Sequence, residues 1–384
     1  MSELKVDTIV NLAGTGKPNL PVSPTLEGAA ISAANTYSYT SSGTEPSSPK
    51  NGALWWDSAN NKVMVYINGE FKEITLNGTY SSDNAWSGDR ALAAGSSGTP
   101  NEIQRFDITT QGNSVDFGDL LNNTTTYFNS TGSSARTLFV GGYDSSISDR
   151  SNVIQYVTPS SPGNATDFGD LTLARSAVKG ATSNGTRAVF SGGLYGGGYF
   201  TNTMDYVTVA NTGNATDFGD TVVSEPARGS QGTTADTTRG LFANASNNTE
   251  RNIDYFTFAT PGNATDFGDL VLYGGMAAGC SDATRTVYSG GRDGGNADNT
   301  NQMCYVTTQT AGNAIDFGDL TFSSQYSLAA VANATRGVSF GGAVSGSATT
   351  NMDFYTIQTA ANAADFADLV NALAVAVGSS GAAS

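Results

Sequence analysis

Short apolar segments separated by polar turns run along most of this chain, and they recur about every fifty residues. In one unit, the small residues of 176–183 predict a first strand, which a turn at Asn184 joins to the apolar segment 188–190. Apolar and polar residues then alternate over 204–208, and a fourth segment surrounds Phe218. Each unit therefore predicts a sheet of four short strands.

A repeated phrase, Asp-Phe-Gly-Asp-Leu with small departures, sets the period of these units. Its six copies begin at Asp116, Asp167, Asp217, Asp266, Asp316 and Asp365. The intervals between them are 51, 50, 49, 50 and 49 residues. A repeat of this length, with four strands in each unit, is typical of a β-propeller, in which the sheets are arranged around an axis as blades. We therefore predict an all-β chain with a six-bladed propeller.

The two ends of the repeat region predict how the ring closes. Only three strands fit before the first copy of the phrase, around 90–92, 103–108 and Phe117. After the last copy, residues 371–378 have the pattern of an innermost strand that no further strand follows. We expect this C-terminal strand to complete the first blade, because closure removes the open edges of the ring.

Within the blades, residue types match the expected positions of the strands. The Phe of each phrase is expected to wedge between neighbouring sheets. An Arg opens the second strand of every unit, at Arg90, Arg136, Arg187, Arg239, Arg285 and Arg336. We expect these Arg and the Asp of the phrases to form ion pairs and to cap turns. Calcium bound at the Asp-x-Gly-Asp turns is the alternative, although the phrases lack the dense Asp/Asn run of calcium loops.

The second strands end in Gly-Gly pairs, intact at 141, 192, 290 and 341, and an aromatic residue follows on the next strand. These aromatic residues are Tyr156, Tyr206, Tyr255, Tyr305 and Phe354; the first unit has Arg105 instead. The pattern resembles the kelch repeat over residues 85–384, with the Phe of the phrase in place of the usual kelch Trp. The resemblance implies an architecture and no particular activity.

Residues 1–80 lie outside the repeat, and residues 81–384 make up the propeller. Segments 52–57, 62–67 and 70–75 predict a three-stranded meander with a tight turn at Asn68. The Ser/Thr/Pro-rich stretch before it, to Pro49, is expected to be a linker or an extended arm. Such a meander is marginal alone, so it should pack on a partner, on another copy of the chain or on the propeller.

The N-terminal residues carry a second resemblance, through the phrases at 5–9 with 14–19 and at 52–57 with 63–66. Together they resemble segments of tail fibre and tail-associated proteins of bacterial viruses, particularly those of marine bacteria and cyanobacteria. The resemblance implies an N-terminal virion anchor that binds other phage tail proteins, and a distal receptor-binding domain. The expected anchor residues are Val6, Ile9, Leu20, Trp55 and Trp56. The alternative is a generic adhesive surface protein with an unrelated small domain.

Composition excludes several classes of function. The 384 residues carry a net charge of −16, which would repel the phosphate backbone of a nucleic acid. No apolar run approaches eighteen residues, so no membrane insertion is expected. The N-terminus has no apolar signal core, so we expect synthesis in a cytosol without export by the classical secretory route. The resemblance to tail proteins implies that this is a host bacterial cytoplasm and that the final place is the virion tail. Cys280 and Cys304 fall on the first and third strands of one blade, which argues against a disulfide.

Catalytic chemistry is largely excluded. The chain has no His, which removes Ser-His-Asp and Cys-His nucleophiles, most zinc sites and the copper site of galactose-oxidase propellers. A pair of carboxylates for glycoside cleavage could remain. Acidic residues occur in the loops after the Gly pairs, at Asp144, Asp149, Asp293 and Asp298. We expect them to be solvated, and we predict no enzyme activity, no metal and no cofactor.

The loops that differ between blades carry the best functional signal. In four-stranded blades, loops between strands two and three lie on the same face as the links between blades. The receptor-binding residues expected on that face are Tyr143, Tyr195, Tyr199, Phe200, Arg292 and Tyr273, with Arg175 and Glu225 nearby. Exposed rings among Gly, Asn and Asp suit a host-surface glycan, and Tyr and Arg also anchor protein interfaces. The rings could instead merely cover the blade ends.

The leading hypothesis is a tail fibre or tail component that recognises a host-surface glycan or protein and can form a homo-oligomer. A glycan-cleaving tail protein and a purely structural tail part are the alternatives. A cytosolic kelch-type adaptor is a weaker one, because no recognisable partner domain accompanies the repeats.

Overall fold

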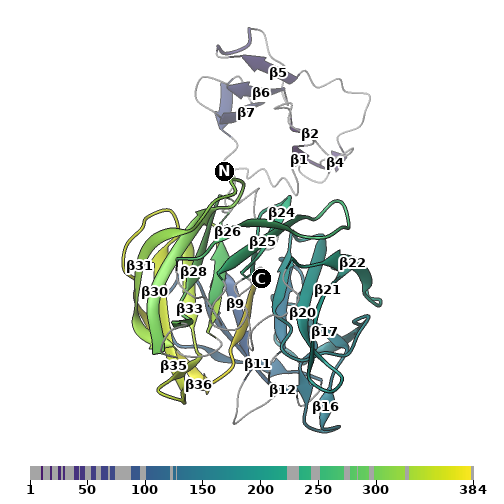
Figure 1. Ribbon diagram of the computed structural model, residues 1–384. Helices are drawn as coiled ribbons and strands as arrows, with labels where there is room; N and C mark the ends of the chain where they lie inside the picture. Colours follow the sequence, from purple (N-terminus) through teal and green to yellow (C-terminus); the bar gives the residue numbers. More distant parts are fainter. Residues whose placement is uncertain are drawn as a thin grey trace. The chain divides into compact units, whose positions relative to one another are not determined.

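The structure is a computed structural model in which every element is a β-strand. It describes residues 10–11, 18–19, 25–26, 29–30, 39–42, 44–47, 53–57, 62–67, 70–73, 88–95, 101–121, 124–126, 128–222, 233–243, 251–271, 277–282, 284–293, 298–324 and 328–381. The chain divides into two compact units, Met1–Tyr80 and Ser81–Ser384 (Figure 1).

The first unit contains the predicted meander. Its four-stranded sheet has the order β5-β6-β7-β8. The strands of this unit are β1 (Val10–Asn11), β2 (Pro18–Asn19), β3 (Thr25–Leu26), β4 (Ala29–Ala30), β5 (Tyr39–Ser42), β6 (Leu54–Asp57), β7 (Lys62–Ile67) and β8 (Glu70–Glu73). Strand β5 runs parallel to β6 and lies within the stretch predicted to be a linker or arm. The Trp55 ring is buried and lies 5.2 Å from that of Phe71.

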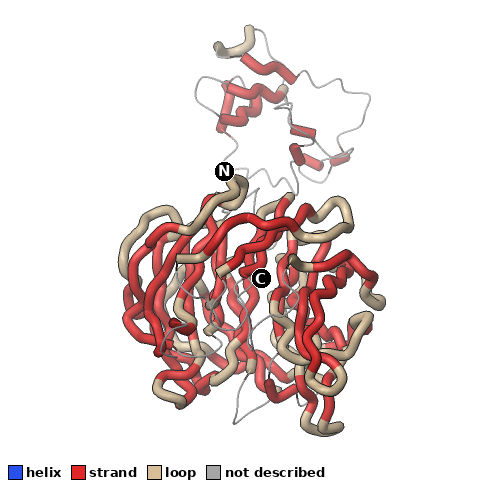
Figure 2. The backbone as a smooth tube through the Cα atoms, viewed as in Figure 1, coloured by secondary structure: helices blue, strands red, loops and turns tan. Residues whose placement is uncertain are grey.

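The second unit is a six-bladed β-propeller of small antiparallel sheets (Figure 2). From blade 1 to blade 6, the innermost strands are β37 (Val377–Gly381), β13 (Asn129–Gly132), β19 (Gly180–Ser183), β23 (Thr233–Ala235), β27 (Ala278–Ser281) and β32 (Ala329–Ala332). The second strands are β9 (Arg90–Ala94), β14 (Thr137–Val140), β20 (Arg187–Tyr195), β24 (Arg239–Ala243), β28 (Arg285–Ser289) and β33 (Arg336–Phe340). The third strands are β10 (Glu102–Asp107), β17 (Val153–Val157), β21 (Tyr199–Thr208), β25 (Asn252–Thr257), β30 (Asp298–Thr307) and β35 (Ser347–Thr356). The outer strands are β11 (Val115–Asp119), β18 (Thr166–Asp170), β22 (Thr216–Asp220), β26 (Thr265–Asp269), β31 (Ile315–Ser324) and β36 (Ala364–Leu373).

The C-terminal strand closes the ring as predicted, but it begins later in the sequence. Strand β36 continues to Leu373, which still pairs with Thr349 of β35. The innermost strand β37 starts at Val377 and pairs along β9. Both Leu373 and Val377 are buried, so the apolar pattern of 371–378 does not reveal the reversal between them. The predicted strand 371–378 is therefore corrected to 377–381.

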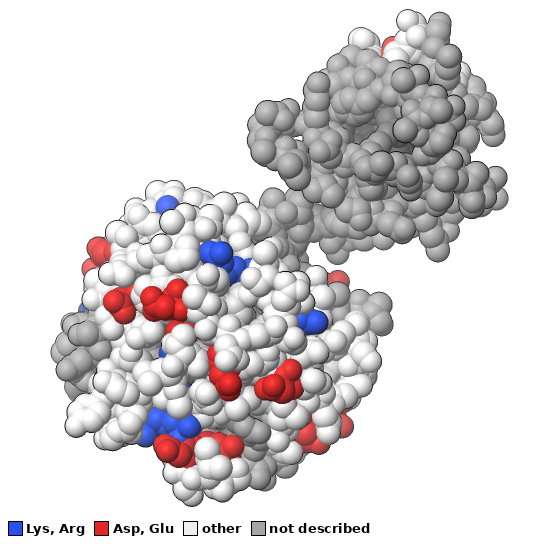
Figure 3. All heavy atoms as spheres, turned by 90° about the vertical axis from the view of Figure 1, so that its right-hand side faces the viewer, with Lys and Arg blue, Asp and Glu red and all other residues white. Residues whose placement is uncertain are grey.

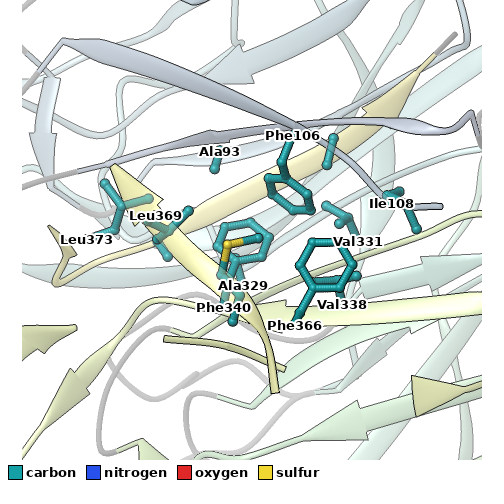
Figure 4. Close-up of a cluster of buried hydrophobic side chains, with 13 residues drawn as sticks. Ala93, Phe106, Ile108, Ala329, Val331, Val338, Phe340, Phe366, Leu369 and Leu373 are labelled. Atoms are coloured by element: carbon teal, nitrogen blue, oxygen red, sulfur yellow. The ribbon is translucent and has the colours of Figure 1, made fainter. Parts of the chain in front are cut away.

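Large apolar side chains fill the spaces between neighbouring blades. Where blade 6 meets blade 1, the buried rings of Phe106, Phe340 and Phe366 meet edge to face (Figure 4). The Phe of every repeated phrase is at most 3% exposed. These observations confirm its predicted role as a wedge between sheets.

The repeated phrase also bonds each blade to the next. The backbone N–H of its second Asp donates to an Asn side chain in the turn that precedes the next copy, over 3.1 to 3.3 Å. The pairs are Asp119 with Asn164, Asp170 with Asn214, Asp220 with Asn263, Asp269 with Asn313, Asp319 with Asn362, and Asp368 with Asn113. The last pair joins the two ends of the propeller. The turn comes so close that a Cβ at Gly118 would lie 2.3 Å from the Gly163 carbonyl oxygen.

The six Arg that open the second strands join the blades differently from our expectation. Their guanidinium groups donate to backbone carbonyls of the following blade. In five blades the guanidinium also stacks on the aromatic residue of the third strand, with Cζ 4.1 to 4.8 Å from the ring centroid. The predicted ion pairs with Asp of the phrases are therefore wrong. The turns before the second strands are capped by residues outside the phrases instead: Asp236 and Asp282 accept the backbone N–H groups of Arg239 and Arg285.

The blades have two distinct ends, which we name the turn face and the loop face. The turn face carries the turns between strands one and two and between strands three and four. The loop face carries the loops between strands two and three and the links between blades. Strand β9 begins at Arg90, on the turn face, beside Gly381 of β37. The chain therefore enters the propeller at the turn face.

Candidate functional site

The loop face differs from blade to blade, whereas the turns of the turn face repeat nearly unchanged. Extra short strands extend it: β12 (Thr124–Thr126), β15 (Tyr143–Asp144) and β16 (Asp149–Arg150) at blade 2, β29 (Arg292–Asp293) at blade 5 and β34 (Ala343–Val344) at blade 6. In blade 3, β20 and β21 are themselves long and form a hairpin.

The blade 3 hairpin ends in a pair of tyrosines. Tyr195 and Tyr199 face each other in register across a three-Gly turn, and their ring centroids lie 6.0 Å apart. Gly196 and Gly198 have positive φ angles of 46° and 98°, which Gly adopts at low steric cost. The side chain of Tyr199 is 67% exposed, while Tyr195 is half-buried.

The neighbouring loop of blade 2 is a second hairpin, β15–β16, which β12 extends into a three-stranded sheet. Asp144 is buried, and its Oδ1 accepts hydrogen bonds from the backbone N–H and the hydroxyl of Ser146 at 2.8 and 2.6 Å. Ile147 at the tip is 63% exposed. The short turn therefore holds a large apolar side chain out in solvent.

A hydrogen bond joins these two hairpins. The Arg150 Nη1 of β16 donates to the Gly196 carbonyl oxygen at 2.5 Å. We name the resulting surface the blade 2–3 lip and define it as Tyr143, Ile147, Arg150, Tyr195 and Tyr199. Of the strands that carry lip residues, β16, β20 and β21 are labelled in Figure 1. The lip combines exposed apolar groups with a backbone that both strand pairing and the Arg150 contact hold in place.

The structure brings four of the six predicted receptor-binding residues to blades 2 and 3. Tyr143, Tyr195 and Phe200 are half-buried, and Tyr199 is exposed. Arg292 belongs to β29 of blade 5, and its side chain lies outside the described part of the structure. Tyr273 and Glu225 lie outside the described residues altogether.

Of the predicted anchor residues, Trp55 is the one whose side chain is described, and it is buried in the first unit. Trp56 belongs to β6, but its side chain is not described. Val6, Ile9 and Leu20 lie outside the described residues.

Arg175 is not displayed on the loop face, contrary to our expectation. Its side chain is fully buried, and Nη1 lies 2.7 Å from Asp205 Oδ2 of β21. Desolvation lowers the pKa of Arg175, and the Asp205 carboxylate opposes that shift. Thr172 donates its hydroxyl to the other Asp205 oxygen at 2.5 Å. Because Asp205 provides a buried carboxylate here, the Arg175 side chain points inward. The ion pair connects the link between blades 2 and 3 to the third strand of blade 3.

A buried amine lies close to the lip. Lys179 is 1% exposed, and its Nζ has no hydrogen-bond partner. Desolvation lowers the pKa of this amine well below 10.5. The Phe200 ring lies 5.9 Å from Nζ, so Phe200 partly covers the amine. Its sequence signal was a lone Lys in a strand of otherwise small residues, which by itself does not indicate burial.

The axis of the propeller offers little room for a ligand. The cavity between the innermost strands has a volume of about 40 Å³ and is lined mainly by small residues of these strands, such as Ser130, Thr182 and Ala330. Such a space holds a few water molecules and is too small for a sugar ring. Within the described ranges, no three His, Cys, Asp or Glu side chains gather as a metal site would require.

The side of the molecule drawn in Figure 3 has a largely uncharged described surface, on which small acidic and basic patches are scattered. Among the residues that the structure describes, none belongs to a helix of the length and apolarity needed to cross a membrane. No protein-family model matches this chain, and no curated protein matches it.

Proposed function

We propose that this chain is a virion tail component that attaches through its N-terminal residues and recognises a host-surface receptor through the blade 2–3 lip. The observation that carries the binding role is the Tyr195–Tyr199 pair, with one ring 67% exposed at the tip of a braced hairpin. Exposing a large ring to water in this way gives the fold no burial energy. Binding supplies a reason for the ring to be there.

A glycan is the ligand class that the lip suits best. Aromatic rings stack on the apolar faces of sugars, and a small number of polar groups then fixes their orientation. The lip offers three Tyr rings and one Arg, and the strands beneath hold them in position. Preorganisation of this kind lowers the entropy that binding would otherwise cost.

The order of the two units along the chain agrees with attachment through the N-terminal residues and receptor binding by the propeller. The first unit precedes the propeller in sequence, and the chain enters the propeller at the turn face. The lip lies on the loop face, at the opposite end of the blades. The lip therefore uses no residue of the first unit. The virion assignment itself rests on the resemblance of the N-terminal phrases to tail proteins.

Adsorption competition tests this proposal. Excess purified propeller should block binding of virus particles to host cells, and Tyr199→Ala should abolish that competition. Ile315→Ala is the matched control, because Ile315 is 56% exposed on an outer strand away from the lip. Absence of any competition by the folded wild-type propeller would refute receptor binding and leave a purely structural tail part.

Glycan cleavage is a second candidate, because Asp144 and Asp149 lie directly opposite each other in the β15–β16 hairpin. Two carboxyl groups about 5 Å apart are typical of retaining glycosidases. However, Asp144 already accepts two hydrogen bonds from Ser146, so binding without cleavage remains the proposal. Shortened host polysaccharide chains after incubation with wild type, but not with Asp149→Asn, would establish cleavage instead.

A further inference from the structure

The Arg–aromatic stack of the propeller is interrupted in one blade. In blades 2 to 6, the Arg that opens the second strand lies against an aromatic ring of the third strand. Blade 1 has the same opening residue, Arg90, but Arg105 stands where the other blades carry the ring. The interruption therefore replaces a neutral ring with a second cation.

Strand register places these two Arg together. In blades 3 to 6, the stacked ring lies two residues before the residue that pairs with the opening Arg. In blade 1, Arg90 pairs with Asp107, and Arg105 lies two residues before it. Residues two apart in a strand point to the same face of the sheet. Arg105 is therefore on the same side of blade 1 as Arg90, facing the seam with blade 2.

Neither guanidinium group has a carboxylate partner among the described residues. Arg90 donates one hydrogen bond, to the Pro159 carbonyl oxygen at 2.9 Å across the seam. The Nε atom of Arg105 is buried and has no hydrogen-bond partner. Asp107 pairs with Arg90 in register, but its Oδ1 accepts hydrogen bonds from Thr109 and Thr110. The carboxylate of Asp89, next to Arg90 in sequence, accepts a hydrogen bond from Asn333 Nδ2 at 3.0 Å.

The local charge is unusual for this protein. The chain carries a net charge of −16, yet two guanidinium groups lie on one face of this blade, and neither forms an ion pair with Asp89 or Asp107 among the described residues. A buried N–H without a partner costs free energy that a bound acceptor would recover. Guanidinium groups offer several donors in a fixed plane, which suits the oxygens of carboxylate and phosphate groups.

We propose that the seam between blades 1 and 2, on the turn face, is a binding site for an oxyanion, with Arg90 and Arg105 as its two donors. The ligand is a phosphate or carboxylate group carried by a partner molecule. This site lies at the opposite end of the blades from the lip and uses none of its residues. It can therefore exist whether or not the lip binds a receptor.

The first test is a titration of the full-length ¹⁵N-labelled protein with inorganic phosphate, and separately with acetate, at constant ionic strength. The chain has twelve Arg, so their Nε–Hε signals can be resolved, and the signal lost in Arg105→Gln identifies Arg105. We expect this signal to shift and saturate with phosphate, with acetate or with both, which shows the oxyanion that the site accepts. The Arg136 signal, from a complete stack with Tyr156, should not shift.

Two variants complete the test. Arg105→Gln should weaken oxyanion binding about tenfold or more, because it removes a charge-assisted donor. Arg105→Tyr restores the ring found in the other blades, so it should fold at least as stably as wild type and lose the oxyanion response. The proposal is overturned if phosphate and acetate shift the Arg105 signal no more than the Arg136 signal. A saturable phosphate or acetate response that persists in Arg105→Tyr would overturn it as well.

Discussion

Deleting residues 377–384 would remove β37 and open the ring between blades 6 and 1. Strand β37 pairs with β9 over five residues, from Val377 with Ala94 to Gly381 with Arg90. It also contacts the innermost strands β13 and β32 on either side. The deletion therefore exposes the whole inner edge of β9 and the apolar clusters on both sides of blade 1.

The size of the effect follows from what the strand covers. Its inter-strand hydrogen bonds contribute about 1 kcal/mol each, but ordering the backbone of these residues costs conformational entropy of similar size. Loss of the hydrogen bonds and removal of this entropic cost therefore nearly cancel. The apolar loss is not offset. Val377 is 2% exposed, and its burial contributes about 2 kcal/mol. Phe340 and Val331 pack against Gly378, and their partial exposure costs about 1 kcal/mol each. We therefore expect the deletion to lower the free energy of unfolding by about 4 kcal/mol.

Calorimetry and urea unfolding of the full-length and truncated chains measure this loss. For a domain of this size, about 4 kcal/mol corresponds to a Tm lower by about 10 °C. The matched control ends at Gly381 and removes only the three residues after β37. Its Tm should equal that of the full-length protein.

A result against the reasoning would be a truncated protein that unfolds at the same temperature and urea concentration as the control. In that case β37 would contribute nothing to stability, and closure of the ring by this strand would be refuted. A truncated protein that forms dimers by pairing its exposed β9 edge would agree with the prediction, because open edges favour such pairing.

Three further predictions concern single residues, each measured by urea unfolding. Gly169→Ala should lower the free energy of unfolding by about 1–3 kcal/mol, because its Cβ would lie 2.4 Å from the Gly213 carbonyl oxygen. Gly112→Ala is the control and should have little effect, because its Cβ meets nothing within 4 Å. Equal losses of stability in the two variants would contradict this account. Arg285→Ala should lower the free energy of unfolding by about 1–3 kcal/mol, since it removes a hydrogen bond to the Ile357 carbonyl and the stack on Tyr305. An unchanged urea midpoint of unfolding would show that the stability of the propeller does not depend on this contact. Lys179→Met should stabilise the protein at neutral pH, because burial lowers the pKa of Lys179 well below 10.5. The folded state then binds fewer protons than the unfolded state between the lowered pKa and about 10.5, so wild type gains stability as pH rises through that window. The gain in stability of Lys179→Met over wild type should therefore shrink toward pH 10.5. A stability difference that stays constant with pH would refute the lowered pKa of Lys179.

The repeat made the architecture predictable from the sequence. Six copies of one phrase at a nearly constant interval fixed the number of blades, since every unit must bury the same Phe against its neighbour. The first unit's three strands, the last of them around Phe117, and the extra segment after the last phrase also implied how the ring closes. These inferences needed only the order and spacing of residues along the chain. The aromatic residues of the variable loops were likewise visible in the sequence, and four of them proved to lie on two adjacent blades.

The partners of polar side chains were decided by the tertiary structure. The six opening Arg donate to carbonyl groups roughly seventy residues away in five seams and across the chain ends in the sixth, and sequence spacing does not reveal such acceptors. Arg175 lies inside because Asp205 meets it there, and Lys179 is buried without a partner. Apolar periodicity reports which face of a strand is covered. Which polar atoms meet depends on how neighbouring blades approach each other, and only the closed ring determines that approach.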